Sequence, residues 1–341
     1  NLACVMCPWR DEAGRSDGSG LMQPQIWAAI KPWLGETDML DFTGGGEPLL
    51  QPRLHRWIKD AADANCRAGF LTNGTLLTTD LARRLVDGGL DWIGFSVDGA
   101  TADVYEAIRP GADFKKLCAG IADMVDLKQN GRPQVILNFV MMTLNVHQLN
   151  NMVQLAADLR VDRINLKQCD VIRSVNRQPL GLFAQQREKQ IRTLEKQLKK
   201  ALRLAERLGV EATAFAFSPD ELPVCAQDPV HSMFIARDGT VAPCINTAYG
   251  GPSRFFQQSV MLSQLNFGRL PEQDLMGIWQ SEPCVSFRDK FARREQAYNR
   301  VLGSSQFEAS FIKLEEAFQD AKDAMPPAAK GCRVCHYLYG V

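Results

Sequence analysis

The first 215 or so residues alternate between short apolar, β-rich runs and amphipathic segments, and this rhythm limits the fold more than any other feature of the sequence. Repeated strand–helix–strand units of this length imply a parallel sheet covered by helices, either open or curved into a barrel. Amphipathic segments at 25–34, 52–64, 77–85 and 146–159 predict helices between the strands. The predicted strands are residues 39–43, 68–72, 92–97, 135–142 and 163–169.

The rhythm changes after about residue 211, and this change predicts a second, smaller unit. Residues 185–208 predict a long charged helix that covers the sheet, and residues 288–323 are helical and charged again. Between them, residues 233–244 predict a β-hairpin with its turn at Asp238 and Gly239. We therefore expect two domains, 1–215 and 216–341.

Charge and hydropathy exclude two classes of partner. The 39 basic and 39 acidic residues balance to zero, whereas a nucleic-acid-binding protein usually has a basic excess or stripe. No apolar run reaches the roughly 18 residues of a membrane span. We expect neither a nucleic acid nor a membrane partner.

Ten cysteines are many for a chain without secretory features, and two C-x-x-C pairs stand at opposite ends, Cys4 with Cys7 and Cys332 with Cys335. In a larger α/β chain such pairs favour metal or redox chemistry over a disulfide framework. This favours bound metal, a reducing compartment and a cytoplasmic location. A bare C-x-x-C pair fits zinc or redox chemistry as well as an iron–sulfur cluster.

Residues 1–8 read N-L-A-C-V-M-C-P, which looks like C-x-x-x-C-x-x-C without its first cysteine. A cysteine just before Asn1 would complete three thiolates. Three thiolates hold three irons of a 4Fe–4S cluster and leave the fourth iron open to another ligand.

Three Gly-, Asn- or Asp-containing turns follow successive predicted strands: 43–48 (T-G-G-G-E-P), 72–74 (T-N-G) and 96–99 (S-V-D-G). Consecutive glycines let the backbone approach a ligand closely. Each turn alone is ordinary turn chemistry, but the carboxyl ends of parallel strands meet at one edge, where active sites collect. The order and spacing of the three turns therefore predict one site.

Together these motifs resemble the radical S-adenosylmethionine (SAM) superfamily, from Asn1 to about Cys169. The resemblance implies an α/β fold, a partial (β/α)6 radical SAM barrel, with its first strand upstream of Asn1. It implies a 4Fe–4S cluster on the cysteine loop, SAM chelated to the open iron, and a reductant such as flavodoxin or ferredoxin. One electron entering the sulfonium yields a 5′-deoxyadenosyl radical, which abstracts hydrogen from a C–H bond.

The resemblance also implies roles for individual residues around SAM. Cys4 and Cys7 would be cluster ligands. The residues implied at SAM are Gly45, Gly46 and Glu47 on its amino group, Ser96 and Asp98 near the ribose, Asn138 near the ribose or carboxylate, Asn73 on the same rim, and the backbone of Met6 against the adenine.

The spacing of Cys225, Gly239 and Cys244 resembles the opening of the SPASM/Twitch extension of these enzymes, and Trp279 and Arg288 sit where that extension tends to carry such residues. With Cys332 and Cys335 there would be four thiolates, which close an auxiliary 4Fe–4S cluster suited to electron transfer. The full SPASM pattern would place a further cysteine at Val341, so either the chain is truncated at both ends or it has a single auxiliary cluster, as in the Twitch version, which is preferred. A zinc knuckle at Cys225 and Cys244, and Cys284 as another ligand, stay open.

Cys169 ends the last predicted strand of the barrel, at the catalytic edge. A thiol there could act catalytically by donating hydrogen to a substrate radical. The alternative is a core thiol.

We expect a radical SAM enzyme of SPASM/Twitch type that abstracts hydrogen from a C–H bond of a small metabolite, because the chain is neutral and a single auxiliary cluster is inferred. Two alternatives are a peptide- or protein-modifying maturase and a non-catalytic iron–sulfur or zinc protein on a decayed scaffold. The intact Gly-Gly-Glu-Pro loop argues against decay. Cobalamin-dependent methylation would need a further domain upstream.

Overall fold

The computed structural model describes residues 1–9, 20–169, 180–182, 188–256, 258–304 and 311–341. The chain divides into two compact units, Asn1–Phe217 and Ser218–Val341. The division falls two residues after the expected limit of 215. Each unit is described by itself.

The first unit contains a six-stranded parallel sheet in the order β1-β2-β3-β4-β5-β6. The five predicted strands are present. The sixth strand follows the long charged helix and was not predicted, because its sequence E-A-T-A contains no large apolar or aromatic side chain. The strands are β1 (Met39–Asp41), β2 (Arg67–Thr72), β3 (Trp92–Ser96), β4 (Gln134–Met141), β5 (Arg163–Gln168) and β6 (Glu211–Ala214).

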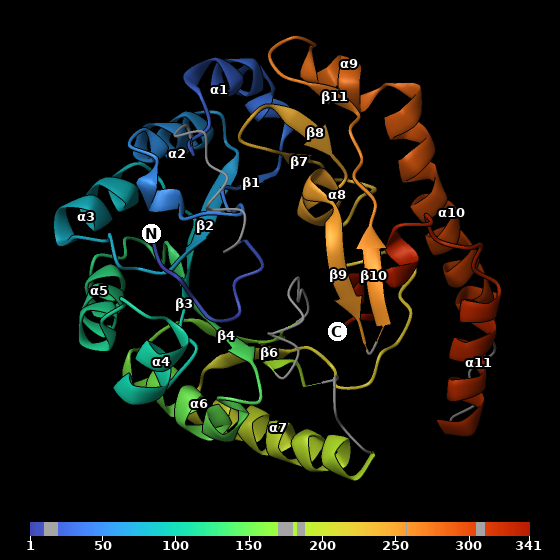
Figure 1. The fold of residues 1–341 in the computed structure, drawn as a ribbon. Helices are drawn as coiled ribbons and strands as arrows, with labels where there is room; N and C mark the ends of the chain where they lie inside the picture. Colours follow the sequence, from blue (N-terminus) through green and yellow to red (C-terminus); the bar gives the residue numbers. More distant parts are fainter. Residues whose placement is uncertain (10–19, 170–179, 183–187, 257, 305–310) are drawn as a thin grey trace. The chain divides into compact units, whose positions relative to one another are not determined.

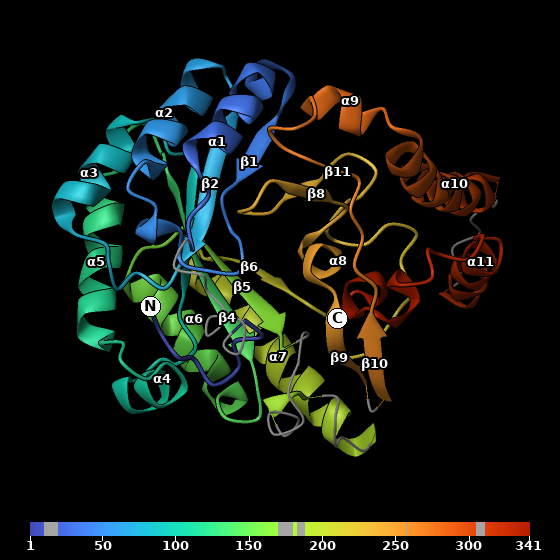
Figure 2. The ribbon, with the colours of Figure 1, turned by 45° about the horizontal axis from the view of Figure 1, so that its top comes forward.

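Helices cover one face of this sheet, as Figures 1 and 2 show. Side chains that close the first turn set the start of two of them: the Thr78 hydroxyl accepts from Leu81 N, and the Asp113 carboxylate accepts from Lys116 N. α4 and α5 lie between β3 and β4, where no helix was singled out in advance. The helices are α1 (Pro24–Ile30), α2 (Leu54–Asp63), α3 (Thr79–Asp87), α4 (Ala102–Ile108), α5 (Phe114–Asp126), α6 (Leu149–Asp158) and α7 (Glu188–Leu208).

The two faces of the sheet differ in chemistry. Phe95, Leu137 and Phe139 on the helix-covered face are fully buried. Alternate residues point to the opposite face, where the register pairs Ser96 with Asn138, Asn138 with Asn165, and Asn165 with Thr213. The helix-covered face holds the core, and the other face carries a polar row that crosses four strands.

The second unit combines small sheets with helices. The predicted hairpin is present as β7 (Phe234–Ile235) and β8 (Thr240–Ala242), and β11 (Gly268–Arg269) extends it to three strands. A second hairpin, β9 (Gly251–Phe255) with β10 (Gln258–Leu262), was not predicted. The remaining helices are α8 (Ile245–Tyr249), α9 (Leu275–Trp279), α10 (Glu282–Ser304) and α11 (Phe311–Asp323).

The predicted helical stretch 288–323 corresponds to α10 and α11, and residues 305–310 between them lie outside the described residues. Within the described parts of the chain, no helix is both long enough and apolar enough to cross a membrane.

Candidate functional site

The amino-terminal cysteine loop is held against the sheet edge by its backbone and by a tryptophan. Val5 N donates to the carbonyl of Ile108 at the end of α4 (3.0 Å), and Cys7 N donates to the carbonyl of Cys4 (3.2 Å), which closes a tight turn. A Cβ on Gly45 would lie 3.2 Å from the ring of Trp9. The cysteine loop and the glycine loop therefore lie side by side.

Cys4 is buried beside a charged pair. Arg109 Nη1 donates to the sulfur of Cys4 (3.5 Å), while Arg109 Nε and Nη2 donate to Oδ2 of Asp98 (2.7 and 2.6 Å). Burial raises the pKa of the Cys4 thiol above its ordinary value, and the Arg109 guanidinium opposes that rise. Arg109 therefore supplies positive charge next to Cys4, the predicted cluster ligand.

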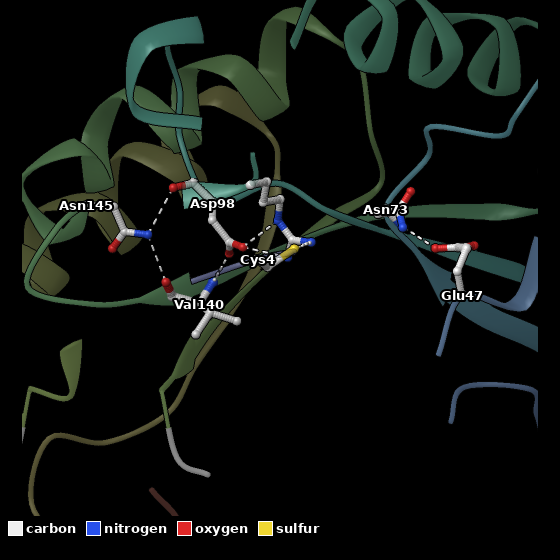
Figure 3. Close-up of polar contacts among 7 residues, drawn as sticks. Cys4, Glu47, Asn73, Asp98, Val140 and Asn145 are labelled. Atoms are coloured by element: carbon white, nitrogen blue, oxygen red, sulfur yellow. Dashed lines mark hydrogen bonds and ion pairs between the residues drawn. The ribbon is translucent and has the colours of Figure 1, made fainter. Parts of the chain in front are cut away.

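Asp98 is fully buried, and both of its carboxylate oxygens are engaged by the protein. Oδ2 accepts from Arg109, and Oδ1 accepts from Val140 N (2.9 Å). Asn145 Nδ2 donates to the carbonyls of Asp98 (3.0 Å) and Val140 (2.9 Å), as Figure 3 shows. In the structure the carboxylate anchors Arg109 and β4, and the predicted place of Asp98 near the SAM ribose stays a prediction.

Glu47 joins the glycine loop to the end of β2. Its Oε1 accepts from Thr72 Oγ1 (2.7 Å) and Leu49 N (3.1 Å), and its Oε2 accepts from Asn73 N (2.9 Å; Figure 3). A carboxylate has about four acceptor sites, so one site stays available for a ligand donor such as an amino group. Asn73 Nδ2 in turn donates to Asn1 Oδ1 (2.9 Å), so Asn73 contacts both the glycine loop and the amino-terminal segment.

Asn138 presents a donor with no partner. Its side chain is only 4% exposed, its Oδ1 accepts from Asn165 Nδ2 (3.1 Å), and its Nδ2 has no hydrogen-bond partner among the described residues. An unsatisfied buried donor is costly, so a bound ligand with an acceptor fits here. Ser96, its register neighbour on β3, lies beside it on the same face. A SAM molecule meets both requirements: an amino group for Glu47 and acceptor oxygens for Asn138.

Gly44 and Gly46 leave open space, because a Cβ on either residue would meet nothing within 4 Å. The backbone between Thr43 and Glu47 is thus accessible to a ligand, as the glycine run predicts.

Cys169 is buried in an apolar cluster with Ile108 and Met142, and the side chain of Met6 packs against this cluster. This environment favours the interpretation of Cys169 as a core thiol over a hydrogen donor. It also ties the cysteine loop to the end of β5 through Met6.

In the second unit the four remaining predicted ligands lie within electrostatic reach of one another. Burial raises the pKa of the Cys332 thiol, and Cys244, Cys335 and Cys225 raise it further. Burial likewise raises the pKa of Cys225 to about 11. Asn246 Nδ2 donates to the sulfur of Cys335 (3.7 Å). These four thiols form the proposed auxiliary ligand set.

No three His, Cys, Asp or Glu side chains in the described residues are grouped tightly enough to hold a single metal ion. Four thiolates can hold either a zinc ion or a 4Fe–4S cluster. Cys284, the alternative ligand, is buried in α10, where burial raises the pKa of its thiol and the charge of Arg288 opposes that rise.

Arg294 on α10 orders the segments around these thiols. Its side chain is 1% exposed, and it donates to the carbonyls of Pro223 (3.1 Å), Leu222 (3.0 Å) and Pro326 (2.6 Å) and to Oε1 of Glu221 (2.7 Å). Arg294 therefore connects the segment before Cys225 with the segment before Cys332.

Two further predicted features are in place. Gly239 has a φ of +88°, and Cys244 begins α8. Arg288 stacks on Trp279, 3.6 Å from the ring centroid. The residues that the sequence analysis missed are Arg109, Val140, Asn145, Asn165, Thr213 and Arg294. None of them belongs to a recognisable motif, and only their contacts reveal them.

The chain matches two family profiles, the radical SAM superfamily over residues 1–156 and an iron–sulfur cluster-binding domain, SPASM, over residues 225–302. It is 24% identical over 299 residues to a tungsten-containing aldehyde ferredoxin oxidoreductase cofactor-modifying protein of Pyrococcus furiosus, across 84% of this chain and 80% of that protein. It is 30% identical over 172 residues to the mycofactocin maturase MftC of Mycobacterium tuberculosis, across 48% of this chain and 42% of the maturase.

Among solved structures, native anSMEcpe with bound AdoMet and Cp18Cys peptide superposes with a TM-score of 0.61 at 15% identity, over 95% of this chain and 94% of that one. This likeness establishes the fold. The chain spans most of the Pyrococcus protein but less than half of the maturase.

Proposed function

Because the chain belongs to the radical SAM superfamily and carries a SPASM domain, we propose that this enzyme abstracts hydrogen from a C–H bond of a peptide substrate. A 4Fe–4S cluster with SAM supplies the reductive cleavage that produces the abstracting radical. The protein residues hold and orient these groups and keep water away.

The observation that carries this proposal is the unpartnered Nδ2 of Asn138, buried on the sheet face that also carries Ser96. Glu47, with one acceptor site left, would take the amino group of SAM together with the backbone of Gly45 and Gly46, which is open at Gly46. Cys4 and Cys7 would be ligands of the cluster. A non-catalytic protein has no need of these ligand-ready groups.

The substrate class rests on relatives. anSMEcpe binds a peptide in a structure that this chain matches almost end to end, and SuiB of Streptococcus suis is solved with its precursor peptide SuiA. These relatives favour the peptide alternative over the small metabolite that the sequence analysis preferred. A metabolite stays the second candidate, because the Pyrococcus relative, matched over 84% of this chain, is named as cofactor-modifying.

We further propose one auxiliary 4Fe–4S cluster on Cys225, Cys244, Cys332 and Cys335, with electrons delivered by flavodoxin or ferredoxin. All ten cysteines lie in the described residues, and none of them is in a disulfide. A reducing, cytoplasmic compartment is part of this proposal.

The test is anaerobic. The reconstituted protein, reduced with dithionite, should convert SAM to 5′-deoxyadenosine, and Cys7→Ala should abolish the conversion. A peptide fraction of a cell extract should stimulate the reaction, and treatment of that fraction with peptidase should remove the stimulation. Stimulation that survives peptidase would favour the metabolite, and absence of any SAM cleavage would refute the proposed function.

A further inference from the structure

A directional chain of side-chain hydrogen bonds runs along the polar row of the sheet. Thr213 Oγ1 on β6 donates to Asn165 Oδ1 (2.6 Å), and Asn165 Nδ2 on β5 donates to Asn138 Oδ1 on β4 (3.1 Å). The register places the three residues directly opposite one another on adjacent strands. Each bond therefore spans a single strand spacing.

The direction of this chain decides which end of the Asn138 amide is presented. An asparagine side chain has an oxygen that only accepts and an NH₂ that only donates. In the structure the Thr213 hydroxyl donates to the oxygen of Asn165, so the NH₂ of Asn165 faces Asn138 and meets its oxygen. The NH₂ of Asn138 is then the end left over.

The surroundings of that NH₂ are consistent with a ligand. Asn138 Nδ2 is buried and has no partner among the described residues. It lies over Gly94 on β3, where a Cβ would come within 2.6 Å of it. Glycine at this position leaves room for the amide.

We propose that Asn165 and Thr213 are positioning residues for SAM: they fix the Asn138 amide so that it offers a donor, and the bound group opposite is an acceptor oxygen. This rests on the proposed function. The acceptor would be a carboxylate or a ribose hydroxyl oxygen of SAM. Neither Asn165 nor Thr213 needs to touch SAM, and neither belongs to the predicted motifs.

The decisive variant is Asn165→Asp. A carboxylate accepts but does not donate, so the Asn138 amide has to turn its NH₂ toward residue 165 and offer its oxygen to SAM. The dissociation constant of SAM, measured by anaerobic equilibrium dialysis on the reconstituted protein, should rise at least about tenfold. Asn150→Asp, which adds the same charge at an exposed site on α6, should leave it unchanged.

The second pair of variants changes the start of the chain. Thr213→Val removes the donor to Asn165 and should weaken SAM binding by about fivefold, the value of one ordinary hydrogen bond. Thr213→Ser keeps the hydroxyl and should bind SAM like the wild type. Residue 213 is exposed at the edge strand, so these variants should fold.

With the Asn165→Asp loss established, Asn138→Asp identifies the acceptor. If Asn138→Asp loses more affinity for SAM than Asn165→Asp does, the acceptor is a carboxylate, because the new negative charge repels it. If Asn138→Asp keeps the affinity of the wild type, the acceptor is a hydroxyl, because a hydroxyl can donate to the new carboxylate.

Unchanged SAM affinity in both Asn165→Asp and Thr213→Val would overturn the inference, as would equal losses in Thr213→Val and Thr213→Ser. If the wild-type protein itself fails to bind SAM, the proposed function fails instead, so the two failures are distinguishable.

Discussion

Arg109 Nη1 donates a hydrogen bond to the sulfur of Cys4 across 3.5 Å, although the two residues are 105 positions apart in the chain. The rest of the guanidinium is held by the buried carboxylate of Asp98. The cysteine loop is thus tied to β3 by a charged contact, and a positive charge lies next to a proposed cluster ligand.

Arg109→Gln should lower the free energy of unfolding of the cluster-free protein by about 3–5 kcal/mol, because it leaves the Asp98 carboxylate buried and without its charged partner. Urea denaturation measures this loss. Arg160→Gln is the matched control: it also breaks an Arg–Asp pair at 2.6 Å, but both of those side chains are more than half exposed. The control should cost about 0–1 kcal/mol. Equal losses in the two variants would contradict the prediction.

Removing the auxiliary ligands should remove one cluster and spare the other. The reconstituted wild-type protein should contain about eight irons, and the combined Ala variant of Cys225, Cys244, Cys332 and Cys335 about four. Cys284→Ala should keep the wild-type content, because Cys284 is buried in α10 and is not one of the four proposed ligands. Iron and sulfide analysis decides the matter. Twelve irons in the wild type would restore two auxiliary clusters, and zinc in place of iron would contradict the assignment.

Gly239→Ala should disrupt the hairpin that leads to Cys244. Gly239 has a φ of +88°, and a Cβ there would overlap the carbonyl oxygen of Leu270. Gly340→Ala is the control within the same unit, since φ is also positive (+67°) but the nearest atom would be 3.6 Å away. Gly340→Ala should lower the free energy of unfolding by about 1–2 kcal/mol through backbone strain alone. Gly239→Ala should lower it by clearly more, because the overlap adds to the strain. Chemical denaturation, followed by a spectroscopic signal from the second unit, compares the unfolding free energies of the two variants. Equal losses would contradict the prediction, because the hairpin would then have moved to relieve the overlap.

Asp41→Asn should change how stability depends on pH. The Asp41 side chain keeps contact with solvent, but neighbouring protein atoms partly desolvate its carboxyl and raise its pKa above the ordinary 3.8. Thr43 and Lys167 oppose this rise only in part, because desolvation is the largest of these influences. A raised pKa in the folded state contributes stability that is complete below 3.8 and is lost as pH rises through the folded pKa.

The unfolding free energy of Asp41→Asn should therefore increase relative to that of the wild type as the pH rises from below 3.8 to neutrality. Urea denaturation of both proteins across this range measures the difference. Asparagine keeps the acceptor for Thr43 N, which donates to Asp41 Oδ1 at 2.8 Å, so the comparison isolates the charge. A difference that stays constant with pH, or that moves the other way, would contradict the prediction.

The predictable part of the fold is the part that repeats. Periodicity located five strands and most of the helices of the first unit, because a buried strand and an amphipathic helix each leave a pattern in consecutive residues. β6 escaped because its four residues are small or polar. The β9–β10 hairpin escaped in the same way, since neither strand alternates clearly between apolar and polar residues.

By itself the sequence determined the sets of chemical groups: two cysteine pairs, the cysteines at 225 and 244, and the glycine loop with Glu47, each recognisable because its spacing is local. Only the tertiary structure decided which groups contact one another. It placed Asp98 against Arg109, and it aligned Asn138, Asn165 and Thr213 in one row. These hydrogen bonds join residues that are between 27 and 105 positions apart in the chain. They depend on strand register and on burial, and the order of residues in the sequence shows neither of these directly.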